Sequence, residues 1–371
     1  MRILVVAPDC PYPPNHGGRK DVYTRLELFH SLGYDVQLVF TAYEQPDRAA
    51  VNHLQTLCSK VIWVKRTKLT AFLPFFQSFQ VRSRSQLSKV SFDVEFDSVI
   101  LESEYVGAML DNRRLVARRV GLRIHNNEEI YYRALANSAT NLLKKAYFLA
   151  EAVYFGRTRD RVFRKVDALY FISHDEFNSS HSENKHFLPT YLAADRFKEF
   201  QVGTSVIFVG NLFTHNNLAA LKWYLQEVHP LLLPISEYKL IVAGNTRGSI
   251  PDFLQGDDIP KLSFIDSPVD LAEVYKNGAV FINPMLSGAG VKIKTVDAIV
   301  QGLPVVSTTV GAEGIGLRDK ETVLIADDSE HFRDAVALLL IDRAYARKIF
   351  DNAHAFLISN YGSAERIVGL L

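Results

Sequence analysis

Short apolar runs alternate with amphipathic stretches along this chain, and the alternation occurs twice. Strands of a parallel sheet that is covered by helices on both faces are nearly continuous apolar runs, and the connecting helices are amphipathic. Two doubly wound parallel sheets are therefore predicted, one after the other. The apolar runs lie at residues 2–7, 35–40, 61–64, 98–101 and 168–172 in the first series, and at 205–209, 239–243, 262–265, 279–283, 304–307 and 323–326 in the second.

The fold class that follows is α/β, with two Rossmann-like domains. A chain of 371 residues is long for one hydrophobic core and fits two domains. We place the first domain at 1–195 and the second at 196–355, because helix signals fade around Pro189 and a new strand begins near residue 205. Ligands of open α/β sheets lie outside the carboxyl ends of the strands, so two such domains that face each other are expected to form one central cleft.

Charge and cysteine content exclude several classes of function. The 42 basic and 41 acidic residues give a net charge of +1, so no global field indicates nucleic acid as a partner. Cys10 and Cys58 make neither a disulfide framework nor a zinc set. The opening residues are too short for a secretory signal, and no apolar run approaches the ~20 residues that cross a bilayer. We therefore predict a cytoplasmic protein.

Residues 284–297 place a glycine turn at the start of a predicted helix. Gly288 and Gly290 let the backbone approach a ligand, and free amide groups at a helix start bind phosphate oxygens. At about 100° per residue, Lys294 and Asp297 lie roughly 60° apart on the helix, whereas Lys292 points away from Asp297. A lysine suits a diphosphate and a carboxylate suits a ribose, so a nucleoside diphosphate site is predicted. An ordinary glycine turn followed by an exposed Lys-Asp pair remains the alternative.

Two further motifs follow predicted strands of the first domain. Gly17 and Gly18 open a predicted helix beside Arg19, which makes either an anion-binding turn or a simple loop-to-helix connection. His125 follows an apolar run at 120–124, and Glu128 lies three residues later. A histidine at a strand end can donate to an oxyanion or orient a hydroxyl group, but a surface or capping histidine is the alternative.

Residues 60–92 contain no acidic residue, and their basic side chains bracket several phenylalanines. Basic side chains beside exposed aromatic ones suit an anionic membrane surface, which is the hypothesis that places the protein at the inner face of the membrane and makes a lipid-linked saccharide its acceptor. A second basic and aromatic stretch at 144–165 favours the same hypothesis. The alternative is that the phenylalanines belong to the core and the basic residues form a solvated rim.

Taken together and in this order, the motifs resemble those of the GT-B glycosyltransferases of family 4, also called glycosyl transferases group 1. The resemblance covers nearly the whole chain. It rests on Pro-Tyr-Pro-Pro-Asn-His-Gly-Gly at 11–18, His-Asn-x-Glu at 125–128, Val-Gly-x5-Asn-Asn at 209–217, the Gly-x-Gly-x-x-x-Lys to Pro-Val-Val-x-Thr run at 288–308, and Gly-Ala-Glu-Gly at 311–314. It implies retaining transfer of a sugar from a nucleotide diphosphate sugar to a saccharide or lipid-linked acceptor. It also implies that residues 356–371 form a helix that crosses back to the first domain.

The resemblance also assigns residues. The catalytic set is His125, Lys294 and Asp297. Donor-binding residues are Gly17, Gly18, Gly210, Asn211, Gly244, Gly288, Ala289, Gly290, Val291 and Lys292. Acceptor-binding residues are Asn15, His16, Arg19, Asn126 and Glu128. The chain departs from the family pattern where Ala289 and Asp297 replace paired glutamates and where Asn211 replaces an arginine.

No Asp-x-Asp sequence and no cluster of ligand residues with metal spacing occur in the sequence. We therefore expect a metal-independent hexosyltransferase without a cofactor, acting in cell-surface polysaccharide synthesis, with Lys294 and helix-end amides stabilising the leaving diphosphate. Two alternatives stay open. One is an enzyme similar to a nucleotide-sugar epimerase, and the other is a non-catalytic GT-B partner subunit, which the replacements at 211, 289 and 297 suggest.

Overall fold

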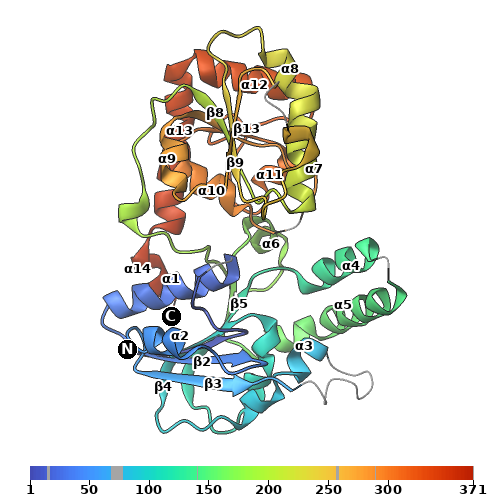
Figure 1. Cartoon of the computed structure of the whole chain (residues 1–371). Helices are drawn as coiled ribbons and strands as arrows, with labels where there is room; N and C mark the ends of the chain where they lie inside the picture. Colours follow the sequence, from blue (N-terminus) through green and yellow to red (C-terminus); the bar gives the residue numbers. More distant parts are fainter. Residues whose placement is uncertain (15–16, 68–77, 140, 256–258, 289, 371) are drawn as a thin grey trace. The chain divides into compact units, whose positions relative to one another are not determined.

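The chain folds into two α/β units (Figure 1). The computed structural model describes residues 1–14, 17–67, 78–139, 141–255, 259–288 and 290–370. The first unit is Met1–Tyr191 together with Ser363–Leu371, and the second is Leu192–Gly362. The sequence placed these divisions at 195–196 and 355–356, whereas the chain divides at 191–192 and 362–363.

The first unit is built on a parallel sheet with the strand order β3-β2-β1-β4-β5-β6-β7. Its strands are β1 (Arg2–Ala7), β2 (Asp35–Ala42), β3 (Lys60–Lys65), β4 (Phe96–Glu102), β5 (Ala117–Ile124), β6 (Ala168–Phe171) and β7 (Lys185–Phe187). The apolar runs predicted as strands are all present. The short β7, whose sequence is Lys-His-Phe, was not predicted because three residues with two polar side chains give no apolar run.

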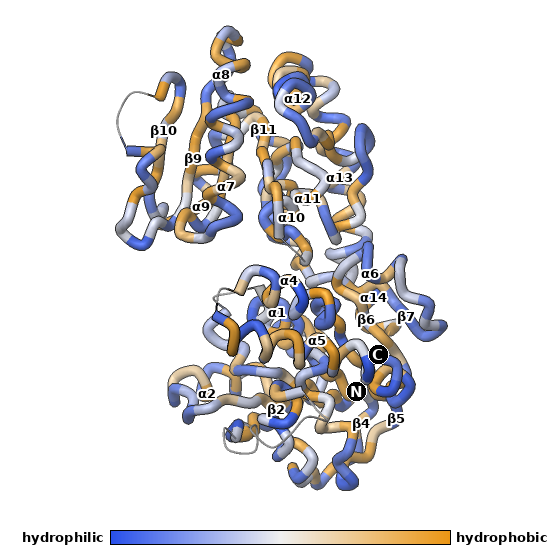
Figure 2. The backbone as a smooth tube through the Cα atoms, turned by 90° about the vertical axis from the view of Figure 1, so that its right-hand side faces the viewer, coloured by the Kyte–Doolittle hydropathy of each residue, from blue (hydrophilic) through white to orange (hydrophobic). Residues whose placement is uncertain are grey.

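Both faces of this sheet are buried. Along β1, Ile3 and Val5 belong to one apolar cluster, and Leu4 and Val6 belong to another on the opposite face. Because successive side chains of a strand point to opposite faces, this division shows that helices cover the sheet on both sides. Figure 2 shows the hydrophobic segments, in orange, gathered inside each unit.

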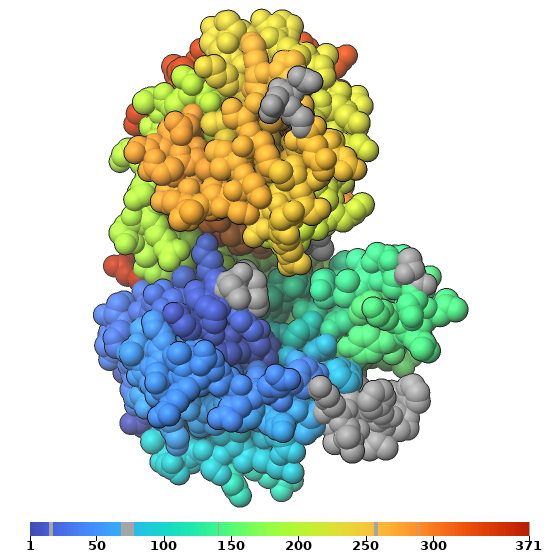
Figure 3. All heavy atoms as spheres, in the orientation of Figure 1, coloured from blue at the N-terminus to red at the C-terminus, as the bar shows by residue number. Residues whose placement is uncertain are grey.

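Helices surround the first sheet. They are α1 (Gly17–Ser31), α2 (Arg48–Leu54), α3 (Phe79–Arg82), α4 (Glu128–Ser138), α5 (Leu142–Phe163), α6 (His174–Ser179) and α14 (Ala364–Gly369), with 3-10 helices η2 (Ser85–Lys89) and η3 (Glu104–Asp111). Helices α4 and α5 pack side by side and form a protruding lobe of this unit, seen in green in Figure 3. None of the helices in the described ranges is both long and apolar enough to cross a membrane.

The second unit repeats the plan with a parallel sheet of strand order β10-β9-β8-β11-β12-β13. Its strands are β8 (Ser205–Val209), β9 (Leu240–Gly244), β10 (Leu262–Asp266), β11 (Gly278–Asn283), β12 (Val305–Ser307) and β13 (Leu324–Ile325). Its helices are α7 (His215–Trp223), α8 (His229–Leu232), α9 (Leu271–Lys276), α10 (Ile293–Val300), α11 (Thr309–Ala312), α12 (Ser329–Ile341) and α13 (Arg343–Tyr361), with η4 (Ala194–Arg196), the π-helical η5 (Tyr224–Val228) and η6 (Asp252–Leu254).

The strand order reverses once in each sheet, between β1 and β4 in the first and between β8 and β11 in the second. The loops that follow these strands run in opposite directions, which leaves a crevice at the carboxyl edge of a doubly wound sheet. The fold prediction of two Rossmann-like parallel-sheet units is confirmed, and it identifies two edges where functional side chains are expected.

Candidate functional site

A cavity of about 460 Å³ lies at the carboxyl edge of the second sheet, beside the reversal between β8 and β11. Five residues that the sequence singled out share its wall, although they come from three separate parts of the chain. These five are Gly210, Asn211, Gly244, Lys294 and Asp297. The position matches the crevice in which α/β proteins bind ligands.

Lys294 is a largely buried cation in this wall. Its Nζ donates to Oδ1 of Asn217 at 2.9 Å, contacts Sδ of Met285 at 3.3 Å and lies 5.2 Å from the ring centroid of Phe208. Within the described ranges no carboxylate is at ion-pair distance from it. Burial, followed by the charge of Lys292, lowers the pKa of the Lys294 ammonium to about 8. An ammonium without a counter-charge is stabilised by an anion that enters the cavity.

Asp297 lies one turn after Lys294 on α10 and lines the same cavity, as the helical spacing predicts. Its carboxylate acts on Tyr275, a buried residue that also lines the cavity. Burial and then the charge of Asp297 raise the pKa of Tyr275 above its ordinary value. The cavity thus presents a cation and an anion within one helical turn, which suits a ligand that has both a phosphate and hydroxyl groups.

Lys292 points elsewhere. Its Nζ donates to the carbonyl oxygens of Gly288 and Gly290 at 3.0 and 2.7 Å and pairs with Glu313 at 3.2 Å. Both glycines have positive φ, 123° and 82°, a region that favours glycine. The side chain of Lys292 is buried and holds the turn that precedes α10, while the predicted contact of this residue with the donor stays a prediction.

Val291 and Ala289 are the other two predicted donor residues in this part of the sequence. Val291 lies half-buried just before α10 and accepts a hydrogen bond from the amide of Ile293 at 3.1 Å. Ala289 lies outside the described residues. Asn283, at the end of β11, joins α10 to α11, because its Nδ2 donates to Oγ1 of Thr295 and to the carbonyl of Gly311, both at 2.8 Å. The Gly-Ala-Glu-Gly motif takes part in both contacts, since Gly311 accepts from Asn283 and Glu313 pairs with Lys292.

Asn217 is a site residue that the sequence analysis did not assign. Its Nδ2 donates to the carbonyl of Asn211 at 3.1 Å while its Oδ1 accepts from Lys294, so it joins the loop after β8 to α10. The signal was the Asn-Asn pair of the 209–217 motif. Position 244, at the end of β9, requires glycine, because a Cβ there would lie 1.8 Å from the carbonyl oxygen of Gly210.

The carboxyl edge of the first sheet carries a different arrangement, a cluster of paired charges around His125. Arg123 Nη2 lies 2.8 Å from Oδ2 of Asp21, and Arg25 Nη2 lies 2.7 Å from the same atom. The two guanidiniums also lie 3.6 and 3.4 Å from Glu102. Burial opposes ionisation of Asp21, yet Arg123 and Arg25 hold the pKa of Asp21 below its usual range. Two buried carboxylates and two buried guanidiniums therefore neutralise each other.

His125 caps this cluster at the surface. Its Nε2 lies 3.2 Å from Glu102 and 4.0 Å from Asp21, and its side chain is 19% exposed. Atoms of Asp21, Glu102 and His125 come within 4.8 Å of one another, which is a spacing that could hold a metal ion. Both carboxylates are already matched by arginines, however, so a divalent cation would have to displace two ion pairs. The arrangement favours an oriented histidine over a metal centre.

The remaining predicted residues of the first unit lie in several places. Gly17 and Gly18 begin α1, and Arg19 follows and pairs with Asp9 at 3.0 Å. Glu128 is buried and accepts a hydrogen bond from the hydroxyl of Tyr105 at 2.5 Å, and burial raises its pKa to about 7. Asn126 is half-buried. Asn15 and His16 lie outside the described residues.

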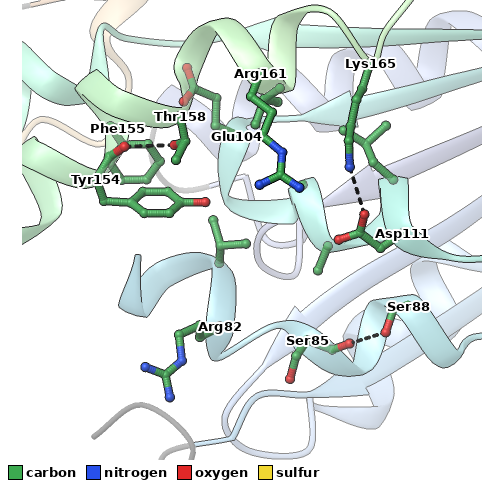
Figure 4. A pocket seen from close by; sticks show the side chains of 15 residues that line it. Arg82, Ser85, Ser88, Glu104, Asp111, Tyr154, Phe155, Thr158, Arg161 and Lys165 are labelled. Atoms are coloured by element: carbon green, nitrogen blue, oxygen red, sulfur yellow. Dashed lines mark hydrogen bonds and ion pairs between the residues drawn. The ribbon is translucent and has the colours of Figure 1, made fainter. Parts of the chain in front are cut away.

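The first unit has two further cavities. One, of about 530 Å³, lies at the carboxyl ends of β1, β2 and β3 and includes Arg19 in its wall. The other, of about 350 Å³, lies between η2, η3 and α5 (Figure 4). In Figure 4 the guanidinium of Arg161 extends into this second cavity, while Lys165 pairs with Asp111 at 2.9 Å. The sequence predicted neither cavity.

Comparison with known proteins links these sites to a family. Residues 203–342 match the model of the family described as glycosyl transferases group 1. An uncharacterised 44.6 kDa protein from the cps region of Klebsiella pneumoniae is 38% identical over 98% of this chain and 97% of its own length.

Solved structures share the fold at low identity. Sucrose-phosphate synthase from Thermosynechococcus elongatus matches with a TM-score of 0.68 and 13% identity, over 100% of this chain and 98% of its own. S. aureus TarM, in a complex with fondaparinux, alpha-GlcNAc-glycerol and UDP, matches at 0.65 and 11%, with the same coverage. Anabaena HepE, in a complex with UDP and glucose, matches at 0.61 and 12%, again over 100% and 98%. The chain belongs to the family of the cps-region protein, its residues 203–342 match the glycosyl transferases group 1 model, and its fold is that of the GT-B glycosyltransferases.

Proposed function

We propose that this protein, which has the GT-B fold, is a retaining, family 4 glycosyltransferase that transfers a hexose from a nucleoside diphosphate sugar to a saccharide or lipid-linked saccharide in cell-surface polysaccharide synthesis. The observation that carries the proposal is the second-unit cavity in which Lys294 is largely buried, has no described carboxylate at ion-pair distance and is followed one turn later by Asp297. UDP in TarM and in HepE, both of the same fold, supports a nucleotide in this cavity. The cps region, which encodes capsule polysaccharide synthesis, supports the pathway.

The proposed donor site uses charge and backbone in complementary ways. Lys294 neutralises the diphosphate, and the turn at Gly288, Gly290 and Val291 brings the backbone close to it at the start of α10. Asp297 accepts hydrogen bonds from the ribose. Gly210, Asn211 and Gly244 line the floor, where the absence of a side chain at Gly244 leaves room. As the sugar departs, charge grows on the diphosphate, and a fixed ammonium in a dry wall stabilises it.

The proposed acceptor site belongs to the first unit. His125 has its ring held by Glu102, so it can present the other nitrogen to an acceptor hydroxyl or to the transferred sugar. Gly17, Gly18, Arg19, Asn126 and Glu128 follow the strands of the same sheet. In a retaining transfer the acceptor attacks the face from which the diphosphate leaves, and a phosphate oxygen takes the acceptor proton. No protein nucleophile is required by this route.

A panel of nucleotides and nucleotide sugars tests the proposal. We expect one of UDP, GDP or ADP to bind by isothermal titration calorimetry, and the matching sugar nucleotide to give transfer to saccharide acceptors. Transfer in excess EDTA tests metal independence, and the anomeric configuration of the product by NMR tests retention. Lys294→Ala is expected to abolish transfer, whereas Lys276→Ala, an exposed lysine of the same unit, is expected to leave it unchanged. Equal turnover by both variants would contradict the donor site.

Two other functions give different results in the same panel. An enzyme similar to an epimerase would convert the sugar nucleotide without any acceptor, and product analysis with donor alone reveals it. A non-catalytic partner subunit would bind no nucleotide. Lys294 favours the transferase over the subunit, because a largely buried ammonium with no described carboxylate at ion-pair distance is costly to keep in a protein that binds no anion.

A cytoplasmic location at the inner face of the membrane is the second part of the proposal. In residues 60–92, Lys68, Phe72, Leu73, Phe75 and Phe76 lie outside the described residues, Arg84 is buried and Arg66 is half-buried. Better support comes from α5, where Leu142 and Leu143 are 81% and 83% exposed beside Lys144 and Lys145. Flotation with anionic liposomes at low salt tests the contact, and Leu142→Ser with Leu143→Ser is expected to reduce it.

A further inference from the structure

Arg66 and Arg84 of the first unit lie next to each other and bind only neutral groups. Arg84 is 3% exposed and donates to the carbonyl of Pro8, to Oγ1 of Thr41 and to Gln80. Arg66 donates to Oγ of Ser83 at 2.9 Å. Oε1 of Gln80 accepts from both guanidiniums, at 3.1 Å from Arg66 and 3.0 Å from Arg84.

No carboxylate compensates these two charges. Across the described residues neither arginine has an acidic group at ion-pair distance, and residues 68–77, which lie outside them, contain no Asp or Glu. Burial and then the charge of Arg66 lower the pKa of Arg84 to about 10, and burial lowers the pKa of Arg66. Both side chains remain charged at neutral pH. A buried guanidinium beside a half-buried one, without a counter-charge, is unfavourable alone and is stabilised by a bound anion.

A cavity of about 530 Å³ lies beside this pair, at the carboxyl ends of β1, β2 and β3. Arg66 lines it, with its guanidinium 4.1 Å above the ring of Tyr43 and its Nη1 directed to no acceptor in the described part of the chain. The two carboxylates in the wall are already engaged, since Asp9 pairs with Arg19 and Asp47 caps α2. Arg66 is therefore the group in this wall that an incoming anion meets.

We propose that this cavity binds the anionic group of an acidic acceptor, with Arg66 as the direct contact and Arg84 behind it as a fixed positive charge. The anion is either the carboxylate of an acidic sugar or the diphosphate of a lipid-linked saccharide. Tyr12 and Tyr43 line the rest of the cavity with aromatic carbon and hydroxyl groups, a surface that suits the attached sugar. The inference rests on the proposed function only where it calls the bound molecule an acceptor.

The cavity of Figure 4 is the competing site for an anion in this unit. Its free guanidinium, that of Arg161, is exposed and not buried, and Lys165 is already paired with Asp111. An exposed cation is stabilised by water and gains less from an anion. Arg161 therefore provides a matched control, because Arg161→Gln removes the same charge from the same unit.

Calorimetry on the full chain tests the inference with three probes: a disaccharide with a terminal glucuronate, its glucose-terminated counterpart, and glucose linked to a short polyprenyl diphosphate. We expect one of the two anionic probes to bind at least about tenfold more tightly than the neutral disaccharide. Arg66→Gln is expected to remove that difference and Arg66→Lys to keep part of it. Arg161→Gln is expected to keep all of it, and UDP affinity is expected to be unchanged in every variant.

The probe that shows the preference identifies the source of the anion. Absence of any anionic preference in the natural chain, or its loss in Arg161→Gln and not in Arg66→Gln, would overturn the inference. Trp63, three residues from Arg66, reports by fluorescence whether each variant is folded. If Arg66→Gln does not fold, the preference measured in Arg66→Lys decides. An acidic probe that binds but receives no sugar would contradict the proposed transfer and leave this inference standing.

Discussion

The two carboxyl edges handle buried charge in opposite ways. Around His125 in the first unit, Asp21 and Glu102 are each matched by Arg25 and Arg123, and the buried charges sum to zero. In the second unit, Lys294 is held by an amide oxygen, a thioether and an aromatic ring, and no described carboxylate pairs with it. The charges of the first edge are paired with one another, whereas the ammonium of Lys294 at the second edge forms no ion pair with a described carboxylate.

This difference separates groups that hold the fold from groups that await a ligand. Removing one member of a buried ion-pair network leaves an uncompensated charge and destabilises the protein. Removing a buried charge that has no partner relieves a penalty and costs only the binding that the charge serves. The comparison therefore predicts that Arg123→Met and Lys294→Met, which both replace a cation by methionine, change the free energy of unfolding in opposite directions.

The largest effect is expected for Arg123→Met. It leaves Asp21 and Glu102 under-compensated in the interior, so the free energy of unfolding of the first unit should fall by about 3–5 kcal/mol. The chain has one tryptophan in each unit, Trp63 and Trp223, so urea unfolding followed by fluorescence in a Trp223→Phe background reports the first unit alone. Unchanged stability together with lost transfer would show that the cluster is catalytic and would break the comparison.

Lys294→Met comes next and should act in the other direction on stability. Nucleotide affinity is expected to fall by about 30- to 100-fold, because the diphosphate loses its cation. The free energy of unfolding of the second unit at pH 7 is expected to rise by about 1–3 kcal/mol. The lowered pKa of Lys294 means that burial of its charged ammonium destabilises the folded state, and methionine removes that charge. Trp223 fluorescence in a Trp63→Phe background measures it. A less stable variant would mean that Lys294 has a structural role.

The pH dependence of UDP affinity sharpens the same point. Below about pH 7 Lys294 is charged in the free protein, so its titration gives no pH effect there. Above its pKa of about 8 the free lysine loses its proton, while a bound diphosphate holds the proton on, so affinity should fall by up to about tenfold per pH unit. Calorimetry from pH 6.5 to 9.5 measures the profile. The same profile in Lys294→Met would assign the titration to another group.

The smallest effect is expected for Lys292→Met. This lysine acts through the glycine turn, by bonds to Gly288 and Gly290 and a pair with Glu313, and it does not line the cavity. Loss of these bonds should loosen the turn and weaken nucleotide affinity by about three- to fivefold. A loss as large as that of Lys294→Met would place Lys292 on the ligand itself.

The sequence was informative where geometry is local. Helical spacing placed Lys294 and Asp297 on one wall, and apolar runs located every strand except the three-residue β7. It was uninformative where a role depends on distant partners. Arg84 was read as a basic surface residue, yet Thr41, 43 residues earlier, and Pro8 take it into the interior. Spacing turned Lys292 away from Asp297, but only the structure shows its bonds to the turn.

The return of residues 363–370 to the first unit also affects how the protein is made. Ile367 completes the apolar cluster that contains Ile3 and Phe29, and Arg366 donates to the carbonyl of Phe187 at 3.0 Å. During synthesis these contacts can form only after the whole of Leu192–Gly362 has left the ribosome. The apolar cluster of the first unit therefore stays incomplete during synthesis, while the second unit is already able to fold. A stop codon just after Gly362 would accordingly destabilise the first unit, although most of that unit is synthesised first.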